Sequence, residues 1–250
     1  MNRASRSSRS PGARWRAVVT DVDGTLTDVD RRLDPRAVAA VRTLERQGIP
    51  VVLATGNVLP IALALHRSLG LSGPIVAENG GVTYRTIAGS PVVDRLADRA
   101  LALRAWRRVR AAGLPVRRLF TDRWRESEVA LEPTVSVARL RAAVGRLPVR
   151  VESTGFAVHL IARDAGKLPA LRRVLEPIGL TVGECVVLGD GDNDVEMLRR
   201  AGFGVSFPSG SRRARAAARY VTHGEYGAGF VEGLKASGIL GGPGPDRGGP

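Results

Sequence analysis

Residues 17–25 read AVVTDVDGT, a short apolar run that leads into two aspartates and a glycine. Four such residues in a row are typical of a strand buried in a parallel sheet. In open α/β sheets ligands lie beyond the carboxyl ends of the strands, and Asp21 and Asp23 follow this strand directly. Side chains two residues apart point the same way along a strand, so we expect both carboxylates to face one site.

A second apolar run leads into a second acidic turn. Residues 185–194 read CVVLGDGDND, which places Asp190, Asp192 and Asp194 after a predicted strand. If the two acidic turns meet, their carboxylates repel one another, and a divalent cation relieves the repulsion because hard cations prefer oxygen ligands. Helix capping accounts for one or two of these acids, but not for both turns together.

Two further elements complete a predicted phosphate site. The strand predicted over residues 49–54 runs into Thr55, Gly56 and Asn57, which offer a hydroxyl and backbone N–H groups at a helix start, where anions bind. Lys167 begins another predicted helix and offers a compact positive charge to a phosphate oxygen. Lys167 and Lys235 are the only lysines among 38 basic residues; the others are arginine. A lysine at a predicted phosphate site in such a chain therefore favours a specific role for its ammonium.

The rest of the chain predicts an α/β fold with a doubly wound, Rossmann-like and mostly parallel sheet, because apolar runs alternate with helical patterns. Asp34 and Pro35 are typical of a helix start, and Gly48 is typical of its end. We expect the catalytic core to comprise residues 14–81 and 163–238. In residues 82–162 strand-like segments surround two helical ones, which predicts an inserted α+β domain.

Both ends of the chain are low in apolar residues. Residues 1–13 are predicted to be a disordered basic tail, and residues 239–250 a flexible tail rich in glycine and proline. The first tail also resembles an organellar transit peptide, but such patterns are weak and an untargeted tail is favoured. A single cysteine, Cys185, fits the reducing cytoplasm, and no apolar run reaches the roughly 18 residues of a membrane span. We therefore expect a cytoplasmic monomer or homodimer.

The net charge of +14 raises the alternative of a nucleic-acid-binding protein. The arginines are spread over predicted helices and do not form one patch interleaved with aromatic residues. A binder of this class would show a steep salt dependence and no Mg²⁺-dependent phosphate release. The acidic turns make this class less favoured than an enzyme, and we expect no nucleic-acid partner.

The order of these motifs resembles the haloacid dehalogenase-like superfamily, and the resemblance covers residues 15–235. It implies that Asp21 is a nucleophile and that Asp23 is a general acid and base. The implied ligands of a Mg²⁺ cofactor are Asp21, the backbone carbonyl of Asp23, Asp190 and Asp194. The phosphate-binding residues that we expect from the motifs are Thr55, Gly56, Asn57 and Lys167. The insert looks like the α+β cap of this superfamily, whereas Asp192 falls at a variable position and receives no role.

Several stretches also resemble the archaeal phosphoglycolate phosphatases, namely residues 55–60, 73–74, 78–81, 123–126 and 226–227. Many cap-bearing relatives have arginine where this chain has Asn57, which favours the narrower group. The implied reaction is hydrolysis of a small phosphomonoester, 2-phosphoglycolate, through an aspartyl-phosphate. The alternative is a phosphatase or phosphotransferase for a sugar phosphate. A second aspartate favours a phosphatase over a dehalogenase, which has no alkoxide that needs a proton.

Arg123 and Arg125 are candidates for binding the carboxylate of such a substrate. An arginine binds a carboxylate through two parallel hydrogen bonds. Two solvated strand arginines in an arginine-rich chain explain the same residues equally well. The sequence leaves these two interpretations open.

Overall fold

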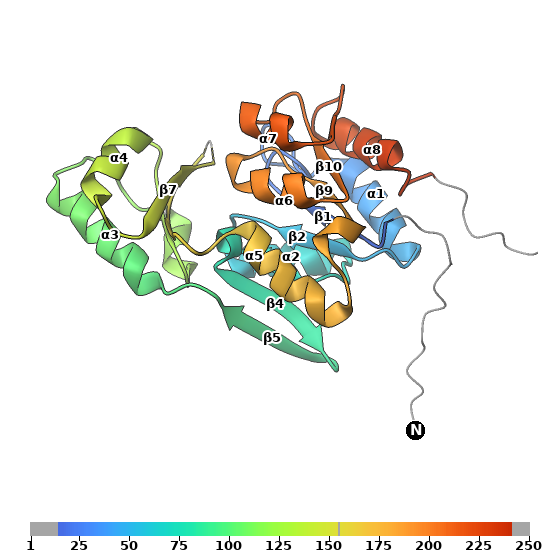
Figure 1. Cartoon of the computed structure of the whole chain (residues 1–250), viewed down its shortest axis with the longest axis horizontal. Coiled ribbons are helices and arrows are strands. Elements are labelled where there is room, and N and C mark those ends of the chain that lie inside the picture. Colours follow the sequence, from blue (N-terminus) through green and yellow to red (C-terminus); the bar gives the residue numbers. More distant parts are fainter. Residues whose placement is uncertain (1–14, 155, 242–250) are drawn as a thin grey trace, which may run out of the picture.

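The computed structural model describes residues 15–154 and 156–241, which form a larger and a smaller unit (Figure 1). The larger unit contains an eight-stranded sheet. Its strands are β1 (Ala17–Thr20), β2 (Val51–Ala54), β3 (Ile75–Ala77), β4 (Val82–Ile87), β5 (Ser90–Arg95), β9 (Cys185–Leu188), β10 (Phe203–Ser206) and β11 (Tyr220–Val221). They lie in the order β11–β10–β9–β1–β2–β3–β4–β5, and the pairs from β11 to β3 are parallel.

Helices cover both faces of this sheet, as predicted for a doubly wound fold. One face carries α1 (Pro35–Arg46), α2 (Leu59–Leu69) and α8 (Tyr226–Ser237), and the other carries α5 (Lys167–Leu175), α6 (Val195–Arg200) and α7 (Arg212–Ala217). Single turns of 3₁₀ helix join some elements: η1 (Glu78–Gly80), η2 (Phe120–Trp124), η3 (Glu176–Ile178), η4 (Val182–Glu184) and η5 (Asp192–Asp194). Buried strand residues alternate between two apolar clusters, one on each face.

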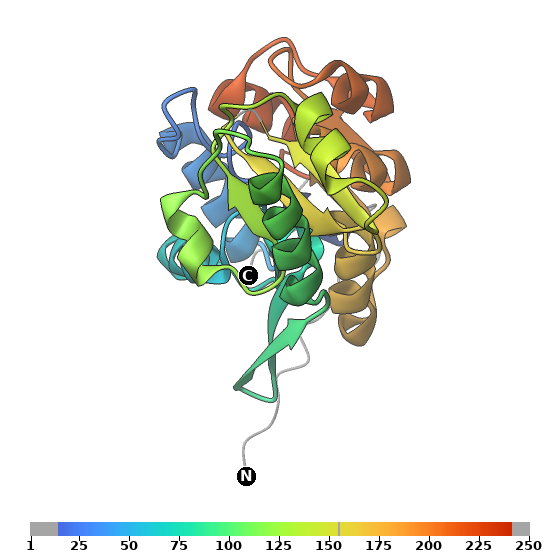
Figure 2. The same cartoon turned by 90° about the vertical axis from the view of Figure 1, so that its left-hand side faces the viewer.

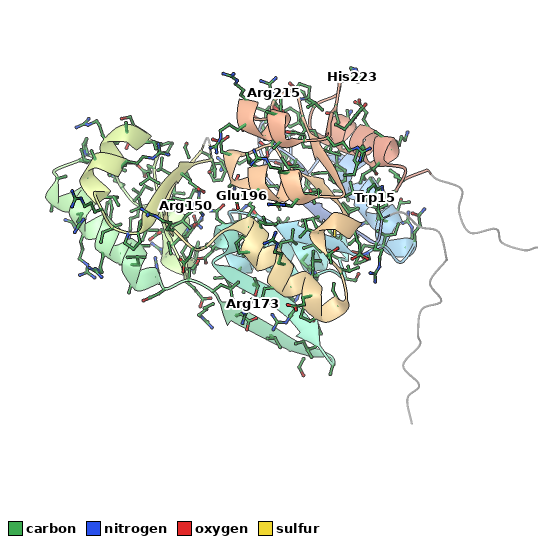
Figure 3. The ribbon with its side chains drawn as sticks, in the orientation of Figure 1. Trp15, Arg150, Arg173, Glu196, Arg215 and His223 are labelled. Carbon is green, nitrogen blue, oxygen red and sulfur yellow. The ribbon has the colours of Figure 1, made fainter. Side chains whose placement is uncertain are left out.

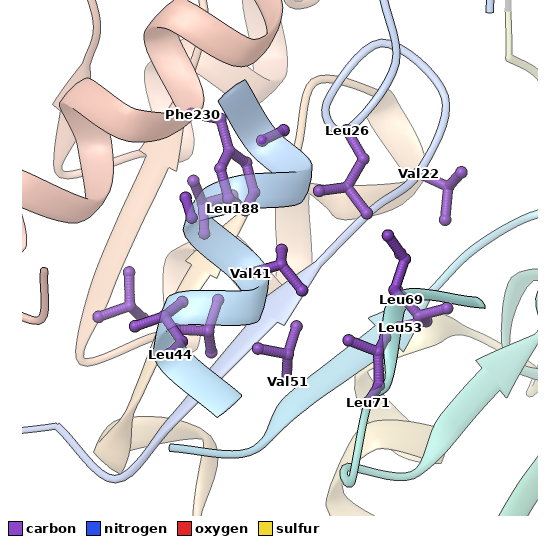
Figure 4. Packing of buried hydrophobic residues seen from close by; sticks show 14 of the residues in the cluster. Val22, Leu26, Val41, Leu44, Val51, Leu53, Leu69, Leu71, Leu188 and Phe230 are labelled. Carbon is purple, nitrogen blue, oxygen red and sulfur yellow. The ribbon is translucent and has the colours of Figure 1, made fainter. Parts of the chain in front are cut away.

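Helix α1 shows how capping residues in the sequence set the position of a helix on the sheet. The Asp34 carboxylate accepts a hydrogen bond from the Arg36 backbone N–H at 2.8 Å, and Pro35 occupies the first turn. Val41 and Leu44 then face the sheet beside Val51 (Figure 4). This cap fixes where the helix begins, and therefore which of its faces is buried.

The strand order places a topological switch point at the centre of the sheet. From β1 the chain adds β2 and β3 on one side, whereas β9, β10 and β11 lie on the other side. Ligands of such sheets bind in the crevice where the order reverses. Asp21 and Asp190 follow the two strands that border this crevice.

The smaller unit, here called the insert (residues 96–162), has its own sheet and core. Its elements are α3 (Arg99–Ala111), β6 (Val129–Leu131), α4 (Val137–Val144), β7 (Val149–Ser153) and β8 (Val158–Ala162). The strands are antiparallel in the order β6–β8–β7, and both helices pack on one face of this sheet (Figure 2). Arg150 lies where the insert meets the core, and its guanidinium donates to the Ala165 carbonyl (Figure 3).

The predicted start of the insert at residue 82 does not match the sheet pairing. Residues 82–95 form the β4–β5 hairpin, which extends the large sheet through antiparallel pairing of Val76 with Thr83. The reason is positional, because β4 follows β3 after a single turn of helix and pairs with it at the open sheet edge. We therefore place the start of the insert after Arg95.

Within the insert, residues 126–128 stay outside the sheet, because β6 begins only at Val129. The preceding backbone N–H groups of Glu126 and Ser127 bind the Glu78 carboxylate of the core at 2.9–3.0 Å. Donors that bind a side chain in this way do not enter a strand ladder. This segment therefore joins the insert to the core.

The two predicted tails have different outcomes. The basic tail predicted over residues 1–13 lies outside the described residues, as do residues 242–250 of the second tail. Ile239 and Leu240, which we assigned to the flexible end, pack against the core cluster beside α8. Across residues 15–154 and 156–241, none of the helices combines the length and the apolar character that a bilayer crossing requires.

Candidate active site

The two acidic turns meet, as the sequence predicts. Carboxylate oxygens of Asp21, Asp190 and Asp194 lie within 4.8 Å of one another beyond β1 and β9. The Lys167 ammonium donates to Asp21 Oδ1 at 2.9 Å and to Asp194 Oδ1 at 2.7 Å. The lysine is 2% exposed, so one buried cation is held between two buried anions.

The pKa values of these groups reflect their burial first and the charges of their neighbours second. Burial raises the pKa of Asp21 well above its usual value, against the lowering effect of Lys167. Burial, together with the charge of Asp194, raises the pKa of Asp190 to about 7. For Lys167 burial lowers the pKa, but Asp194 and Asp21 outweigh it and the net shift is upward. The lysine alone does not neutralise the carboxylates.

The donor set fits a hard divalent cation. All three side chains offer carboxylate oxygens, the ligand type that Mg²⁺ and Ca²⁺ prefer. The raised pKa values mark a place where added positive charge favours ionised carboxylates. The residues present therefore suit a metal, although their identity does not by itself select one.

Gly24 allows the acidic turns to approach each other this closely. Its φ of 79° lies in the left-handed region, and a Cβ at this position would stand 2.5 Å from Asp190 Oδ2. The next residue, Thr25, donates from Oγ1 to Asp190 Oδ1 at 3.3 Å. Thr25 is a site residue that the sequence analysis did not single out.

The second aspartate is held by Asn57. The Asn57 side-chain amide donates to Asp23 Oδ2 at 2.6 Å, and its backbone N–H donates to Thr55 Oγ1 at 3.0 Å. We expected Asn57 to bind phosphate, but its donors point to protein groups. Asn57 instead orients Asp23, because the amide fixes one carboxylate oxygen. Thr55 is fully buried beside it, at the end of β2.

A cavity of about 350 Å³ opens over the acidic centre. Core and insert both line it. The lining residues are Asp21, Asp23, Gly56, Ser153, Thr154, Phe156, Asp190, Gly191, Asp192, Asn193, Ser209 and Ser211. Ser153 ends β7 of the insert, and Thr154 and Phe156 come from the loop that follows it, so this end of the insert covers the site.

Neither candidate cap arginine lies on the wall of this cavity. Arg123 is exposed, and its guanidinium lies 4.2 Å from the centroid of the Phe120 ring. Arg125 is only 4% exposed, is ion-paired with Glu128, and donates to the Gly56 carbonyl at 3.0 Å. Arg125 therefore supports the backbone of the predicted phosphate-binding turn, whereas Arg123 stacks on the surface.

A buried polar network joins the insert to the core. Glu128 accepts hydrogen bonds from Arg125, from His159 at 2.8 Å and from Asn79 at 3.0 Å. Asn79 also accepts from the Asn193 side chain at 2.9 Å, within the second acidic turn. Although burial raises the pKa of Glu128, the charges of His159 and Arg125 lower it overall. The network therefore depends on an ionised Glu128.

Glu128→Gln is expected to lower the free energy of unfolding by about 3 kcal/mol at pH 7, because it leaves buried cations without an anion. A lowered folded pKa contributes stability that is present above the unfolded value of about 4.3 and is lost as pH falls through the folded value. Urea unfolding from pH 7 to pH 3 should therefore show the difference from wild type shrinking only below about 4.3.

The exposed Glu176 provides the control, since Glu176→Gln removes a glutamate that lies outside the network. Its unfolding free energy should follow the wild type at every pH. If the unfolding free energy of Glu128→Gln equals that of wild type at pH 7, or differs from it by the same amount down to pH 3, the charge-dependent role of Glu128 is contradicted.

Several site residues were not found from the sequence. Ser153, Thr154 and Phe156 line the cavity from the end of β7 and the loop after it, a stretch without a recognisable motif. Asn79 belongs to the quoted stretch 78–81, but nothing in the sequence indicates that it links the two units. Contacts between units depend on tertiary packing, which local patterns do not encode.

Comparison with known proteins places the chain in a family. The model of haloacid dehalogenase-like hydrolases matches residues 18–111 and 134–234. The phosphoglycolate phosphatase of Methanothermobacter thermautotrophicus is 37% identical over 220 residues, which make up 88% of this chain and 97% of that protein. That of Archaeoglobus fulgidus is 36% identical over 225 residues, 90% of this chain and 98% of that protein.

Solved structures agree with the fold. The crystal structure of Thermoplasma acidophilum 0175 has a TM-score of 0.82 and 26% identity, covering 90% of this chain and 99% of that one. A haloacid dehalogenase-like hydrolase from Bacteroides thetaiotaomicron has a TM-score of 0.67 at 22% identity, covering 83% of this chain and 94% of that one, and shares the fold. Together with the paired acidic turns, these matches show that the chain belongs to the haloacid dehalogenase-like hydrolase family.

Proposed function

We propose that this protein is a Mg²⁺-dependent phosphatase that hydrolyses 2-phosphoglycolate to glycolate and phosphate through an aspartyl-phosphate on Asp21. The observation that carries the proposal is the Asp21 carboxylate on the cavity wall, beside Asp190 and Asp194 and hydrogen-bonded to Lys167. The names of the curated archaeal relatives support the substrate. The single cysteine, Cys185, supports action in the cytoplasm.

Asp21, Asp190 and Asp194, with the backbone carbonyl of Asp23, would hold the cation. When bound, Mg²⁺ supplies positive charge that stabilises the oxygens of the transferred phosphoryl group. The oxygen-only donor set and the raised pKa of Asp190 support this assignment.

The chain's own residues carry the two displacement steps. An Asp21 carboxylate oxygen attacks phosphorus, the ester P–O bond breaks, and Asp23 gives its proton to the departing alkoxide. Asp23 then takes a proton from the water that attacks the aspartyl-phosphate, which releases phosphate and regenerates Asp21. The Asn57 amide holds Asp23 at 2.6 Å throughout.

Lys167, Thr55 and Gly56 are proposed to bind the phosphate. An ammonium has three N–H donors, of which Lys167 uses two on Asp21 and Asp194, so the third is available to a phosphoryl oxygen. Gly56 lines the cavity, and the buried Thr55 hydroxyl precedes it at the end of β2. The cavity volume of about 350 Å³ suits a small ester.

The test is phosphate release from 2-phosphoglycolate, glucose 6-phosphate, a mononucleotide and p-nitrophenyl phosphate, with MgCl₂ or with EDTA. We expect the highest kcat/KM for 2-phosphoglycolate, complete loss in EDTA and recovery on addition of Mg²⁺. A preference for the hexose phosphate would overturn 2-phosphoglycolate as the substrate, because it would favour the alternative of a sugar-phosphate phosphatase. Release that persists in EDTA would overturn the metal-dependent reaction.

A further inference from the structure

The cavity that binds the proposed substrate has a strongly negative wall. Four of its lining residues are aspartates, and none of the lining residues described is an arginine or a lysine. A substrate that carries a carboxylate in addition to its phosphate needs a second cation near this cavity. Lys167 is committed to the acidic centre, so the cation must come from elsewhere.

Arg31 can meet this need, whereas Arg213, which also contacts a lining residue, is paired with Asp192. Arg31 lies in the loop between β1 and α1, and its guanidinium lies 4.9 Å from the centroid of the Phe156 ring, which lines the cavity. Burial raises the pKa of Asp23. The hydrogen bond from Asn57 opposes this rise most strongly, and the positive charge of Arg31 opposes it as well, so the charge of Arg31 reaches the site.

The loop holds Arg31 in an unusual backbone conformation. Its φ of 61° lies in the left-handed region, which residues other than glycine seldom adopt. Two hydrogen bonds close the turn. The Arg31 backbone N–H donates to the Asp28 carbonyl at 3.0 Å, and the Arg32 backbone N–H donates to Asp28 Oδ1 at 2.9 Å. Residues in strained backbone conformations of this kind are common at ligand sites.

The Arg31 side chain is also free to bind an anion. It is exposed, and none of the ion pairs within residues 15–154 and 156–241 involves it. The cap arginines differ, because Arg125 is paired with Glu128 and Arg123 lies on Phe120. A guanidinium binds a carboxylate through a planar pair of hydrogen bonds.

We propose that Arg31, positioned by the Phe156 ring, binds the carboxylate of the substrate and thereby determines specificity for a phosphorylated hydroxy acid. This inference rests on the proposed function. The substrate bridges the site, with its phosphate at Asp21 and Lys167 and its carboxylate turned toward the β7–β8 loop.

The test compares two substrates that differ in the carboxylate, namely 2-phosphoglycolate and 2-hydroxyethyl phosphate. Arg31→Gln should lower kcat/KM for 2-phosphoglycolate by about 10- to 100-fold, mainly through KM, because a charge-assisted hydrogen-bonded pair is lost. The same variant should change kcat/KM for 2-hydroxyethyl phosphate, which lacks the carboxylate, less than threefold, a bound set by the small effect of screened charges. Arg31→Lys should restore part of the loss, and Phe156→Leu should reproduce a smaller loss on 2-phosphoglycolate.

Arg32→Ala is the matched control, because Arg32 is the next residue of the same loop and is exposed. It should leave the preference between the two substrates unchanged. Equal losses of Arg31→Gln on both substrates, or a preserved preference, would overturn the Arg31 assignment while the phosphatase function stands. A wild-type enzyme that releases phosphate from neither substrate would overturn the proposed function, and the Arg31 assignment with it.

Discussion

Asp21→Asn is expected to abolish phosphate release from 2-phosphoglycolate, lowering kcat by about 10⁴-fold or more, as loss of a nucleophile does in other enzymes. An amide does not form the acyl-phosphate, whereas the neighbouring Asp190, Asp194 and Lys167 remain in place. The measurement is initial-rate phosphate release at saturating Mg²⁺, combined with acid quenching and mass analysis for a phosphorylated Asp21.

The loss should not reflect unfolding. Lys167 keeps Asp194 as an acceptor at 2.7 Å, and Asp21→Asn removes one of the repelling buried carboxylates. The free energy of unfolding in EDTA should therefore stay level or rise. Asp30→Asn, in an exposed part of the loop after β1, should keep full activity. A phosphorylated protein formed by Asp21→Asn from labelled substrate would show that another residue is the nucleophile.

Lys167→Met should affect both catalysis and stability. The missing charge on the phosphoryl oxygens should lower kcat by about 10²- to 10³-fold. Asp21 and Asp194 also lose their shared cation, which should lower the unfolding free energy in EDTA by about 3 kcal/mol. The raised pKa of Lys167 means that the wild-type ammonium stays charged across the neutral range, so both effects should be present throughout it.

Added Mg²⁺ should recover part of the stability of Lys167→Met, because a bound cation again compensates the carboxylates. It should not recover the rate. The other lysine of the chain, Lys235, is exposed on α8, and Lys235→Met should match the wild type in both measurements. A Lys167→Met protein with wild-type stability in EDTA and a rate within about tenfold of wild type would remove Lys167 from the site.

The elements of the core could be predicted where the sequence contains clear apolar runs or helix-capping residues. The strands β1 and β9 and the start of α5 at Lys167 agree with the prediction, and so do the Asp34 cap and the Pro35 start of α1. Helix α8 was missed because Gly227, Gly229 and Gly233 lower its helix propensity. Its glycines serve packing instead, since a Cβ at Gly233 would stand 2.5 Å from Val205 Cγ1.

The site was predictable where its chemistry depends on motifs, and not where it depends on orientation. The acidic turns and Lys167 were expected to meet, and they do. Asn57 was expected to bind phosphate, yet its amide turns to Asp23. Arg31 shows no sequence signal in an arginine-rich chain, because its role follows from a contact with a loop more than a hundred residues away.

Glu78 has a consequence for how molecules enter and leave. Its fully buried carboxylate accepts hydrogen bonds from three donors of Glu126 and Ser127. Swinging the whole insert away would strip this anion of its partners, a large penalty for a buried charge. Molecules that reach Asp21 are therefore expected to enter through the cavity as the docked core and insert shape it, without a hinge motion of the whole insert.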